Sequence, residues 1–261
     1  MHTIRNYIMA ESLEQAWELN QKGRNNIIIG GNLWLKMGNR NILNAIDLSG
    51  LGLDKIEEDA NGFRIGCMAT LHDIETHEGL NTEFQDLFRE AVRHIVGVQF
   101  RNCATVGGSI FPKLGFSDVL TAFLACDTQV ILYKKGEVPL RKFIYMPTDN
   151  DILTHIYVKK DGRKTAYESF RMTETDFPTI TCAVAKTGDH FETVLGARPK
   201  HAEVVIDEKL ADTLSKEDVE AYAKRVIDKL QYGSNIRGSE QYRKQLSKVL
   251  ISRCISRLTE E

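Results

Sequence analysis

Cysteine is scarce and scattered in this sequence. The five cysteines stand at positions 67, 103, 126, 182 and 254, and no two of them form a Cys-x-x-Cys pair. The odd number argues against a disulfide framework, and the spacing argues against an iron–sulfur or zinc site. We therefore expect no metal in this chain, so that any cluster must belong to another chain.

Long hydrophobic runs and a strong excess of one charge are also missing. No stretch of about 18 apolar residues exists to cross a bilayer, and the first residues lack the hydrophobic centre of a secretion signal. The 34 basic and 36 acidic residues give a net charge of −2, which offers no electrostatic reason for a nucleic-acid partner. These absences predict a cytoplasmic protein without membrane or nucleic-acid partners.

Motifs for acid–base or nucleophilic catalysis are absent as well. The seven histidines are dispersed, and neither His-Glu-x-x-His nor Gly-x-Ser-x-Gly occurs. We therefore predict no catalytic residue. The chemistry would belong to a cofactor, with the protein providing binding, orientation and electrostatic tuning.

Two turns with adjacent glycines are the most informative feature that is present. Gly30 and Gly31 follow the β-branched run Ile27–Ile29, and Gly107 and Gly108 follow a second such run. Without Cβ atoms the backbone bends sharply and lets a ligand approach its N–H groups. One such pair alone is usually only a turn, but two of them could hold one diphosphate from both sides.

Apolar periodicity outlines the secondary structure of the first 165 residues. Ser12 opens a helix with a capping box, and Thr70 with Asp73 opens a helical pattern that continues to residue 95. A further apolar helix begins at Ser117 or Asp118. Strands are predicted over residues 26–29, 41–47, 63–66, 129–133 and 152–158.

The length of the chain and the pattern of its last hundred residues predict more than one lobe. A chain of 261 residues with 42% hydrophobic content buries a sizeable core and exceeds the usual size of a single domain. Its last part is predicted to contain strands over residues 179–185, 191–195 and 203–206, and helices over residues 215–230 and 239–258.

A family resemblance rests on three segments that occur in the right order. The run Arg101–Ile110, followed by Ser117-Asp118 and an apolar helix, closely resembles the FAD-binding medium subunit of molybdenum hydroxylases, the xanthine dehydrogenase and carbon monoxide dehydrogenase group. The segment Ile29–Leu33 resembles the first flavin loop of that family, and Arg237–Leu246 resembles its final helix. The resemblance covers nearly the whole chain.

The resemblance implies an α+β fold. Residues 1–165 would form a two-lobed FAD-binding domain of the PCMH type, with lobes of about 1–56 and 57–165. Residues 166–261 would form a smaller C-terminal domain of the carbon monoxide dehydrogenase flavoprotein type, with an antiparallel sheet and helices.

The resemblance also implies a set of residues that bind FAD. One wall around the diphosphate would consist of Ile28, Ile29, Gly30, Gly31, Asn32 and Leu33, and the other wall of Thr105, Gly107, Gly108 and Ser109. Asp118 would lie near the adenosine part, with helix capping as its alternative role, and Leu153 would lie near the flavin, with core packing as its alternative.

Three positions depart from the family pattern. Relatives often have Thr-Asp or Ser-Asp where this chain has Asn32-Leu33, and often Asn where it has Ser109. A basic residue that some relatives place near the flavin is replaced around Glu168, although Arg171 is close in sequence. The two loops are therefore expected to stay polar enough to bind the diphosphate. Whether a basic residue lies near the flavin ring is left open by the sequence.

By this resemblance the chain would be an FAD subunit of a xanthine dehydrogenase-like molybdenum hydroxylase. It would pass electrons from the iron–sulfur clusters of one partner, through FAD, to NAD or another acceptor, while a molybdopterin subunit oxidises the substrate. Two alternatives are a self-sufficient FAD reductase of the same fold superfamily and a non-catalytic flavin-binding assembly component.

Overall fold

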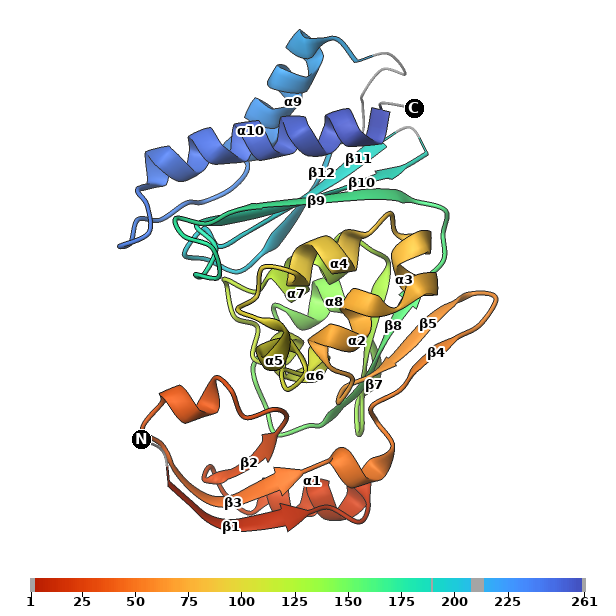
Figure 1. Cartoon of the computed structure of the whole chain (residues 1–261), viewed down its shortest axis with the longest axis vertical. Coiled ribbons are helices and arrows are strands. Elements are labelled where there is room, and N and C mark those ends of the chain that lie inside the picture. The colour runs from red at the N-terminus through yellow and green to blue at the C-terminus, as the bar shows by residue number, and fades with distance from the viewer. Residues whose placement is uncertain (1–2, 189, 208–213, 260–261) are drawn as a thin grey trace. The chain divides into compact units, whose positions relative to one another are not determined.

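The computed structural model describes residues 3–188, 190–207 and 214–259. The chain forms two compact units, and each unit is assembled from separate stretches of sequence (Figure 1). The first unit comprises Met1–Asp73, Val98–Pro112 and Thr128–Val158, and the second comprises Ile74–Gly97, Lys113–Asp127 and Lys159–Glu261.

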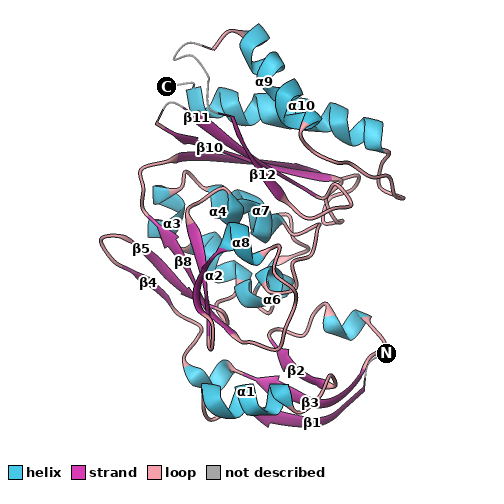
Figure 2. Cartoon of the chain, turned by 180° about the vertical axis from the view of Figure 1, so that it is seen from behind, coloured by secondary structure: helices cyan, strands magenta, loops and turns pink. Residues whose placement is uncertain are grey.

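The first unit begins with a three-stranded parallel sheet in the order β1-β3-β2. Helix α1 (Leu13–Gln21) connects the first two strands and lies against the sheet (Figure 2). The hydroxyl of Ser12 accepts a hydrogen bond from the Gln15 N–H, so Ser12 caps this helix as expected. The Gln15 side chain accepts from the Glu11 N–H and not from that of Ser12, so only half of the predicted capping box forms. The strands are β1 (Thr3–Met9), β2 (Asn26–Ile29) and β3 (Asn41–Asp47).

An asparagine ladder crosses this small sheet at one level. Asn6 donates to Asn44 at 3.0 Å, Asn44 donates to Asn26 at 2.8 Å, and Asn26 donates to the Leu19 carbonyl of α1 at 2.8 Å. Each amide thus fixes the strand beside it. The ladder sets the register of β2, the strand that leads into the first glycine pair.

The rest of the first unit is a five-stranded sheet with short helices. The strand order is β4-β5-β8-β6-β7. The strands are β4 (Ile56–Glu58), β5 (Gly62–Gly66), β6 (Thr128–Leu132), β7 (Gly136–Pro139) and β8 (Leu153–Lys159). The helical segments are η1 (Leu35–Met37), η2 (Ser49–Leu51), α2 (Leu71–Thr76), α5 (Val98–Arg101), α6 (Val106–Ile110) and α8 (Leu140–Phe143).

The second unit has a helix–sheet–helix arrangement (Figures 1 and 2). Helices α9 (Lys216–Asp228) and α10 (Glu240–Thr259) cover one face of an antiparallel sheet, and α4 (Leu87–Val92) and α7 (Asp118–Leu124) cover the other face. The strand order is β12-β11-β10-β9. The strands are β9 (Lys164–Phe170), β10 (Ile180–Thr187), β11 (His190–Gly196) and β12 (Glu203–Asp207). The last three strands and helices α9 and α10 confirm the elements predicted for the last hundred residues to within a few positions, whereas β9 has no predicted counterpart.

The prediction of one continuous helix from residue 70 to residue 95 is wrong. The chain instead forms α2, α3 (Glu78–Glu83) and α4. The amide of Asn81 donates to the carbonyls of Ile74 and His77 and accepts from the Arg89 N–H, so a side chain replaces helical backbone bonds. Gln85 and Asp86 then turn the chain with positive φ angles of 45° and 60°.

Candidate functional site

The first glycine pair ends β2 and leaves a row of N–H groups without acceptors. No acceptor in the described part of the chain receives the N–H groups of Gly31, Asn32 and Leu33. Asn32 has a positive φ of 57°, a conformation that Asn tolerates better than most residues. Consecutive N–H groups in such a turn form a concave site for an anion.

Asn32 also carries an unsatisfied side chain. Its Oδ1 position is buried and has no hydrogen-bond partner among the residues that the structure describes. Oxygen and nitrogen of an amide are assigned from the surrounding bonds, so the group at this position either accepts or, turned over, donates. Since a buried polar atom without a partner is costly, this amide is suited to a ligand atom.

The second glycine pair lies inside a short helix and not in a turn. Thr105 is the N-cap of α6, and its Oγ1 accepts from the Gly108 N–H at 3.2 Å. The Gly107 N–H donates to the Cys67 carbonyl at 2.8 Å, and the Ser109 N–H donates to the Thr105 carbonyl. The expected sharp turn at this pair is therefore wrong, and its N–H groups are already used within the protein.

The two glycine segments touch each other directly. A Cβ atom added to Gly30 would overlap Thr105 Oγ1, and one added to Gly31 would overlap the carbonyl of Cys103. Nearby, the rings of Trp34 and Phe100 stack edge to face with centroids 5.3 Å apart. We call residues 28–34 and 100–109, joined by these contacts, the loop clasp.

Leu153 lies beside the connection that links the loop clasp to the larger sheet. It is a buried residue of β8. The carbonyl of its neighbour Thr154 accepts from the Cys67 N–H at 2.8 Å, and the Cys67 carbonyl accepts from Gly107. The predicted residues of the two walls and Leu153 thus belong to one unit, in which Ile28 and Leu33 are partly exposed and Ile29 is buried.

Asp118 belongs to the second unit, where its carboxylate is in a buried polar cluster. Its Oδ1 accepts from the Tyr167 hydroxyl at 2.5 Å and from Arg171 Nη2 at 2.7 Å. Burial raises the pKa of Asp118, although Arg171 and the Tyr167 hydroxyl act in the opposite direction. Arg171 is therefore committed to Asp118, and Glu168 forms an ion pair with Arg257.

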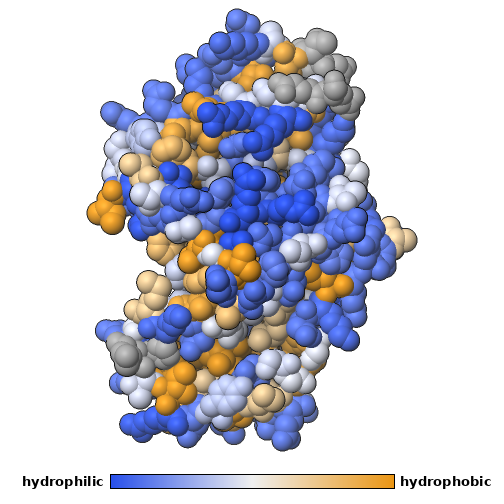
Figure 3. Space-filling model, in the orientation of Figure 1, coloured by the Kyte–Doolittle hydropathy of each residue, from blue (hydrophilic) through white to orange (hydrophobic). Residues whose placement is uncertain are grey.

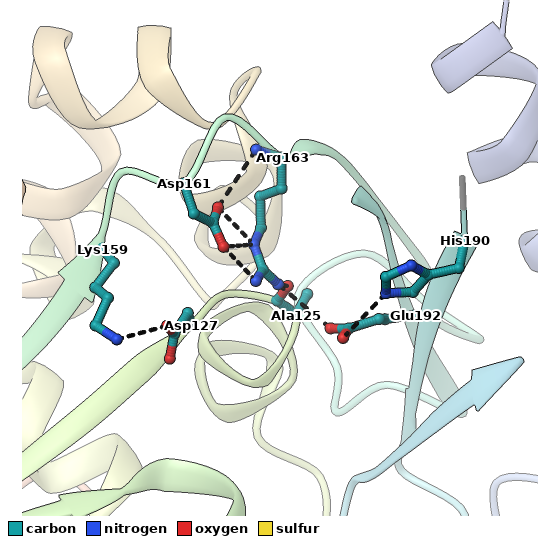
Figure 4. Close-up of polar contacts among 7 residues, drawn as sticks. All are labelled: Ala125, Asp127, Lys159, Asp161, Arg163, His190 and Glu192. Atoms are coloured by element: carbon teal, nitrogen blue, oxygen red, sulfur yellow. Dashed lines mark hydrogen bonds and ion pairs between the residues drawn. The ribbon is translucent and has the colours of Figure 1, made fainter. Parts of the chain in front are cut away.

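A second buried charge cluster lies at the edge of the same unit (Figure 4). The Arg163 guanidinium is only 6% exposed and contacts Asp161 at 2.5 Å, the Ala125 carbonyl at 2.5 Å and Glu192 at 3.3 Å. Its Nε, Nη1 and Nη2 atoms all donate to protein oxygens, which is typical of a structural ion pair. Sequence reasoning missed this cluster, because its members come from separate segments.

Metal ligands are not gathered anywhere in the described parts of the chain, and none of the helices there is long and apolar enough to span a bilayer. All five cysteines are free, and four of them are buried. Burial raises the pKa of the Cys67 thiol to about 12, so this thiol is protonated and inert at neutral pH.

Comparison with known proteins identifies the family of the chain. The family described as FAD binding domain in molybdopterin dehydrogenase matches residues 2–158. The chain is 27% identical to the glyceraldehyde dehydrogenase medium chain of Sulfolobus acidocaldarius, covering 94% of each protein, and 24% identical to the 6-hydroxypseudooxynicotine dehydrogenase complex subunit alpha of Paenarthrobacter nicotinovorans, covering 96% and 93%.

A solved structure shows the same fold. It is that of a carbon monoxide dehydrogenase from Hydrogenophaga pseudoflava that lacks the Mo-pyranopterin moiety of its cofactor, and it superimposes with a TM-score of 0.87 at 23% identity over 98% of this chain and 97% of the other. The expected α+β fold is confirmed. The chain therefore belongs to the family of FAD-binding domains of molybdopterin dehydrogenases, and it is an FAD-binding oxidoreductase subunit.

Proposed function

We propose that this chain holds FAD as the electron relay of a multi-subunit molybdenum hydroxylase. It would stand between the iron–sulfur clusters of one partner, which receive electrons from a molybdopterin subunit, and NAD or another acceptor. The observation that carries the proposal is the loop clasp, with its row of unused N–H groups next to the unsatisfied Asn32 amide. The relative from Paenarthrobacter, named as a subunit of a dehydrogenase complex, supports the multi-subunit part.

The loop clasp offers hydrogen-bond donors that would suit the diphosphate of FAD. A diphosphate presents anionic oxygens, and the N–H groups of Gly31, Asn32 and Leu33 are donors without an acceptor in the described chain. An Asn32 amide turned to donate would add a further bond. Gly107 and Gly108 would contribute close approach and not N–H donors, since theirs are already used.

The other predicted contacts remain part of the proposal. Ile28, Ile29 and Gly30 would line the wall behind the diphosphate, Thr105 and Ser109 the opposite wall, and Leu153 an apolar surface near the flavin. Asp118 would contact the adenosine part of FAD through its carboxylate. The Oδ1 atom of this carboxylate already accepts hydrogen bonds from Tyr167 and Arg171. When bound, FAD supplies the redox chemistry, and the protein orients the cofactor and shields it.

The first test is the visible absorption spectrum of the purified chain, with mass identification of the released cofactor. Stoichiometric FAD is expected, and the Asn32→Gly variant is expected to release it more readily. Reduction through a co-purified iron–sulfur chain, followed by reoxidation with NAD, would establish the relay. A flavin-loaded chain that co-purifies with no iron–sulfur protein from its source would contradict the proposal.

A further inference from the structure

A stretch of sequence without carboxylates surrounds the first glycine pair. No aspartate or glutamate occurs between Glu18 and Asp47, although the whole chain has 36 acidic residues and a net charge of −2. The basic residues of this stretch are Lys22, Arg24, Lys36 and Arg40. Its charge is therefore opposite in sign to that of the chain, and it includes the first part of the loop clasp.

The side chains of these four basic residues are exposed and keep their charge unpaired. All four residues are exposed. None of them forms an ion pair with a carboxylate in the described ranges 3–188, 190–207 and 214–259. On α10, in contrast, Lys248 pairs with Glu220 and Arg257 pairs with Glu168. The positive charge around the first glycine pair is therefore not neutralised locally.

Three of these residues lie at one edge of the N-terminal sheet. Strands β1, β2 and β3 are parallel, so their first residues lie at the same edge. Arg40 precedes β3 and donates from Nη2 to the carbonyl of Arg24, which precedes β2, at 3.4 Å. Lys22 is the C-cap of α1, two residues before Arg24. Lys22, Arg24 and Arg40 thus form one cluster of positive charge.

Lys36 connects this cluster with the loop clasp. It lies on η1, in the connection between β2 and β3. The Lys36 N–H donates to the Asn32 carbonyl at 3.3 Å, and the Met37 N–H donates to the Trp34 carbonyl at 3.2 Å. The backbone of η1 is thus bonded to the clasp itself, and the flexible stem of Lys36 begins one turn beyond Asn32. We call Lys22, Arg24, Lys36 and Arg40 the basic strip.

One carboxylate opposes the basic strip. Asp47 ends β3 and lies opposite Ile29 in the register of the sheet. Its Oδ2 accepts from the Tyr7 hydroxyl at 2.6 Å, and its Oδ1 accepts from the Ser49 N–H at 2.8 Å. In the lower part of Figure 3, where the N-terminal sheet lies, hydrophilic residues stand beside apolar ones. Over residues 19–47 the balance is four positive charges against one negative charge.

We propose that the basic strip attracts the anionic diphosphate of FAD and speeds its entry into the loop clasp, where Lys36 then pairs with it. This inference rests on the proposed function, in which the clasp holds the diphosphate. Backbone N–H groups act only at hydrogen-bond distance, whereas exposed cations act over about 10 Å at 0.1 M salt. A field of unpaired charges can raise the association rate of an oppositely charged ligand by about ten- to a thousandfold.

The test measures how fast FAD binds to the full-length apoprotein. Flavin fluorescence is followed by stopped flow at several salt concentrations, and the rate constants of association and dissociation are determined separately. For wild type, the association rate at low salt is expected to exceed that at high salt by about tenfold or more, because salt screens the basic strip.

Two charge reversals separate attraction at a distance from contact with the bound cofactor. Arg24→Glu and Lys36→Glu are each expected to lower the association rate roughly threefold or more at low salt, and much less at high salt. Lys36→Glu alone is expected to raise the dissociation rate as well, since Arg24 precedes β2 and the clasp follows it. Lys36→Arg keeps the charge and is expected to keep both rates close to wild type.

Two further variants control this comparison. Arg253 is an exposed residue of α10 that has no ion pair in the described part of the chain, so Arg253→Glu changes the net charge equally. It is expected to keep the wild-type rates. Asp47→Asn removes the opposing charge and is expected to raise the association rate at low salt. Arg24→Glu and Asp47→Asn decide the question if Lys36→Glu does not fold.

The outcomes separate this inference from the proposed function. If wild type binds no FAD at any salt concentration, the proposed function fails and the basic strip fails with it. If wild type binds FAD at a rate that salt does not change, or if Arg24→Glu and Lys36→Glu bind as fast as wild type, only the basic strip is overturned. An equal loss in Arg253→Glu also overturns it, because net charge would then explain the effect. Slower association in the two strip variants alone supports it.

Discussion

The carbonyl of Cys103 occupies the space that a side chain at Gly31 would need. The two residues belong to different glycine segments, and their contact brings the row of unused N–H groups next to the cap of α6. Gly31 is therefore required by the protein itself and not only by a ligand. Gly31 and Gly108 are therefore expected to respond differently to substitution, whereas a Cβ atom at Gly107 would also overlap a backbone carbonyl, that of Cys67.

Gly31→Ala is expected to destabilise the protein even without cofactor. Its new methyl group would overlap a backbone carbonyl, and overpacking of this kind costs about 1–3 kcal/mol. Gly108→Val is the matched comparison, because a Cβ there lies 3.0 Å from a single neighbour, Thr105 Oγ1. It should retain most of the fold and lose FAD. Urea unfolding and FAD content check both, and wild-type stability of Gly31→Ala would refute the close contact.

Asn32→Gly is expected to weaken FAD binding without weakening the fold. Glycine keeps the positive φ of 57° without strain but removes the unsatisfied amide. Loss of a hydrogen bond to a charged group corresponds to about 1.5–3 kcal/mol, or roughly tenfold or more in affinity. Fluorescence titration of the apoprotein with FAD measures this.

Asn32→Asp serves as the control for the previous variant. A carboxylate next to the diphosphate should weaken FAD binding further than glycine does, because two anions repel. Equal affinities of Asn32→Gly, Asn32→Asp and wild type would remove Asn32 from the site.

Arg163→Met is expected to destabilise the second unit strongly. It would leave Glu192 and Asp161 without their buried partner, and breaking a buried pair costs about 3–5 kcal/mol. Lys159→Met is the control, since Lys159 and Asp127 form a half-exposed pair 2.8 Å apart that should contribute no more than about 1 kcal/mol (Figure 4). Equal midpoints of urea unfolding for the two variants would contradict this difference.

The Asp161–Arg163 pair should also affect the pH dependence of stability. Burial opposes ionisation of Asp161, but the hydrogen bonds and charge of Arg163 outweigh it and lower its pKa below the ordinary value of 3.8. The carboxylate therefore stabilises the fold above pH 3.8, and this contribution disappears as pH falls through its folded pKa. Unfolding free energies measured from pH 6 downwards should fall less steeply in Asp161→Asn than in wild type.

Local signals in the sequence were sufficient for many elements. Ser12, Ser117 and Ser215 each cap the helix that they were expected to precede, because a hydroxyl before a helical run satisfies N–H groups nearby in sequence. The two glycine pairs also identified both parts of the loop clasp. The predicted lobe boundary near residue 165 stays a prediction.

What could not be predicted depends on contacts between distant residues. The helix breaks near Asn81 because the side chain of this residue forms hydrogen bonds with the backbone of Ile74, His77 and Arg89. Apolar periodicity in the sequence does not reveal such bonds. The helical state of Gly107 and Gly108 depends on Cys67 and on the cap at Thr105. The pairing of Arg171 with Asp118 joins two residues that the sequence suggested for separate roles.

The divided first unit has a consequence for biosynthesis. Its three stretches leave the ribosome with parts of the second unit between them, and β8, which the Cys67 and Gly107 connection requires, belongs to the last stretch. The nascent chain therefore exposes unpaired strands until this stretch has emerged, a situation in which aggregation competes with folding. FAD is then expected to bind late in the maturation of this protein. Chaperones can act on the incomplete chain until that stage.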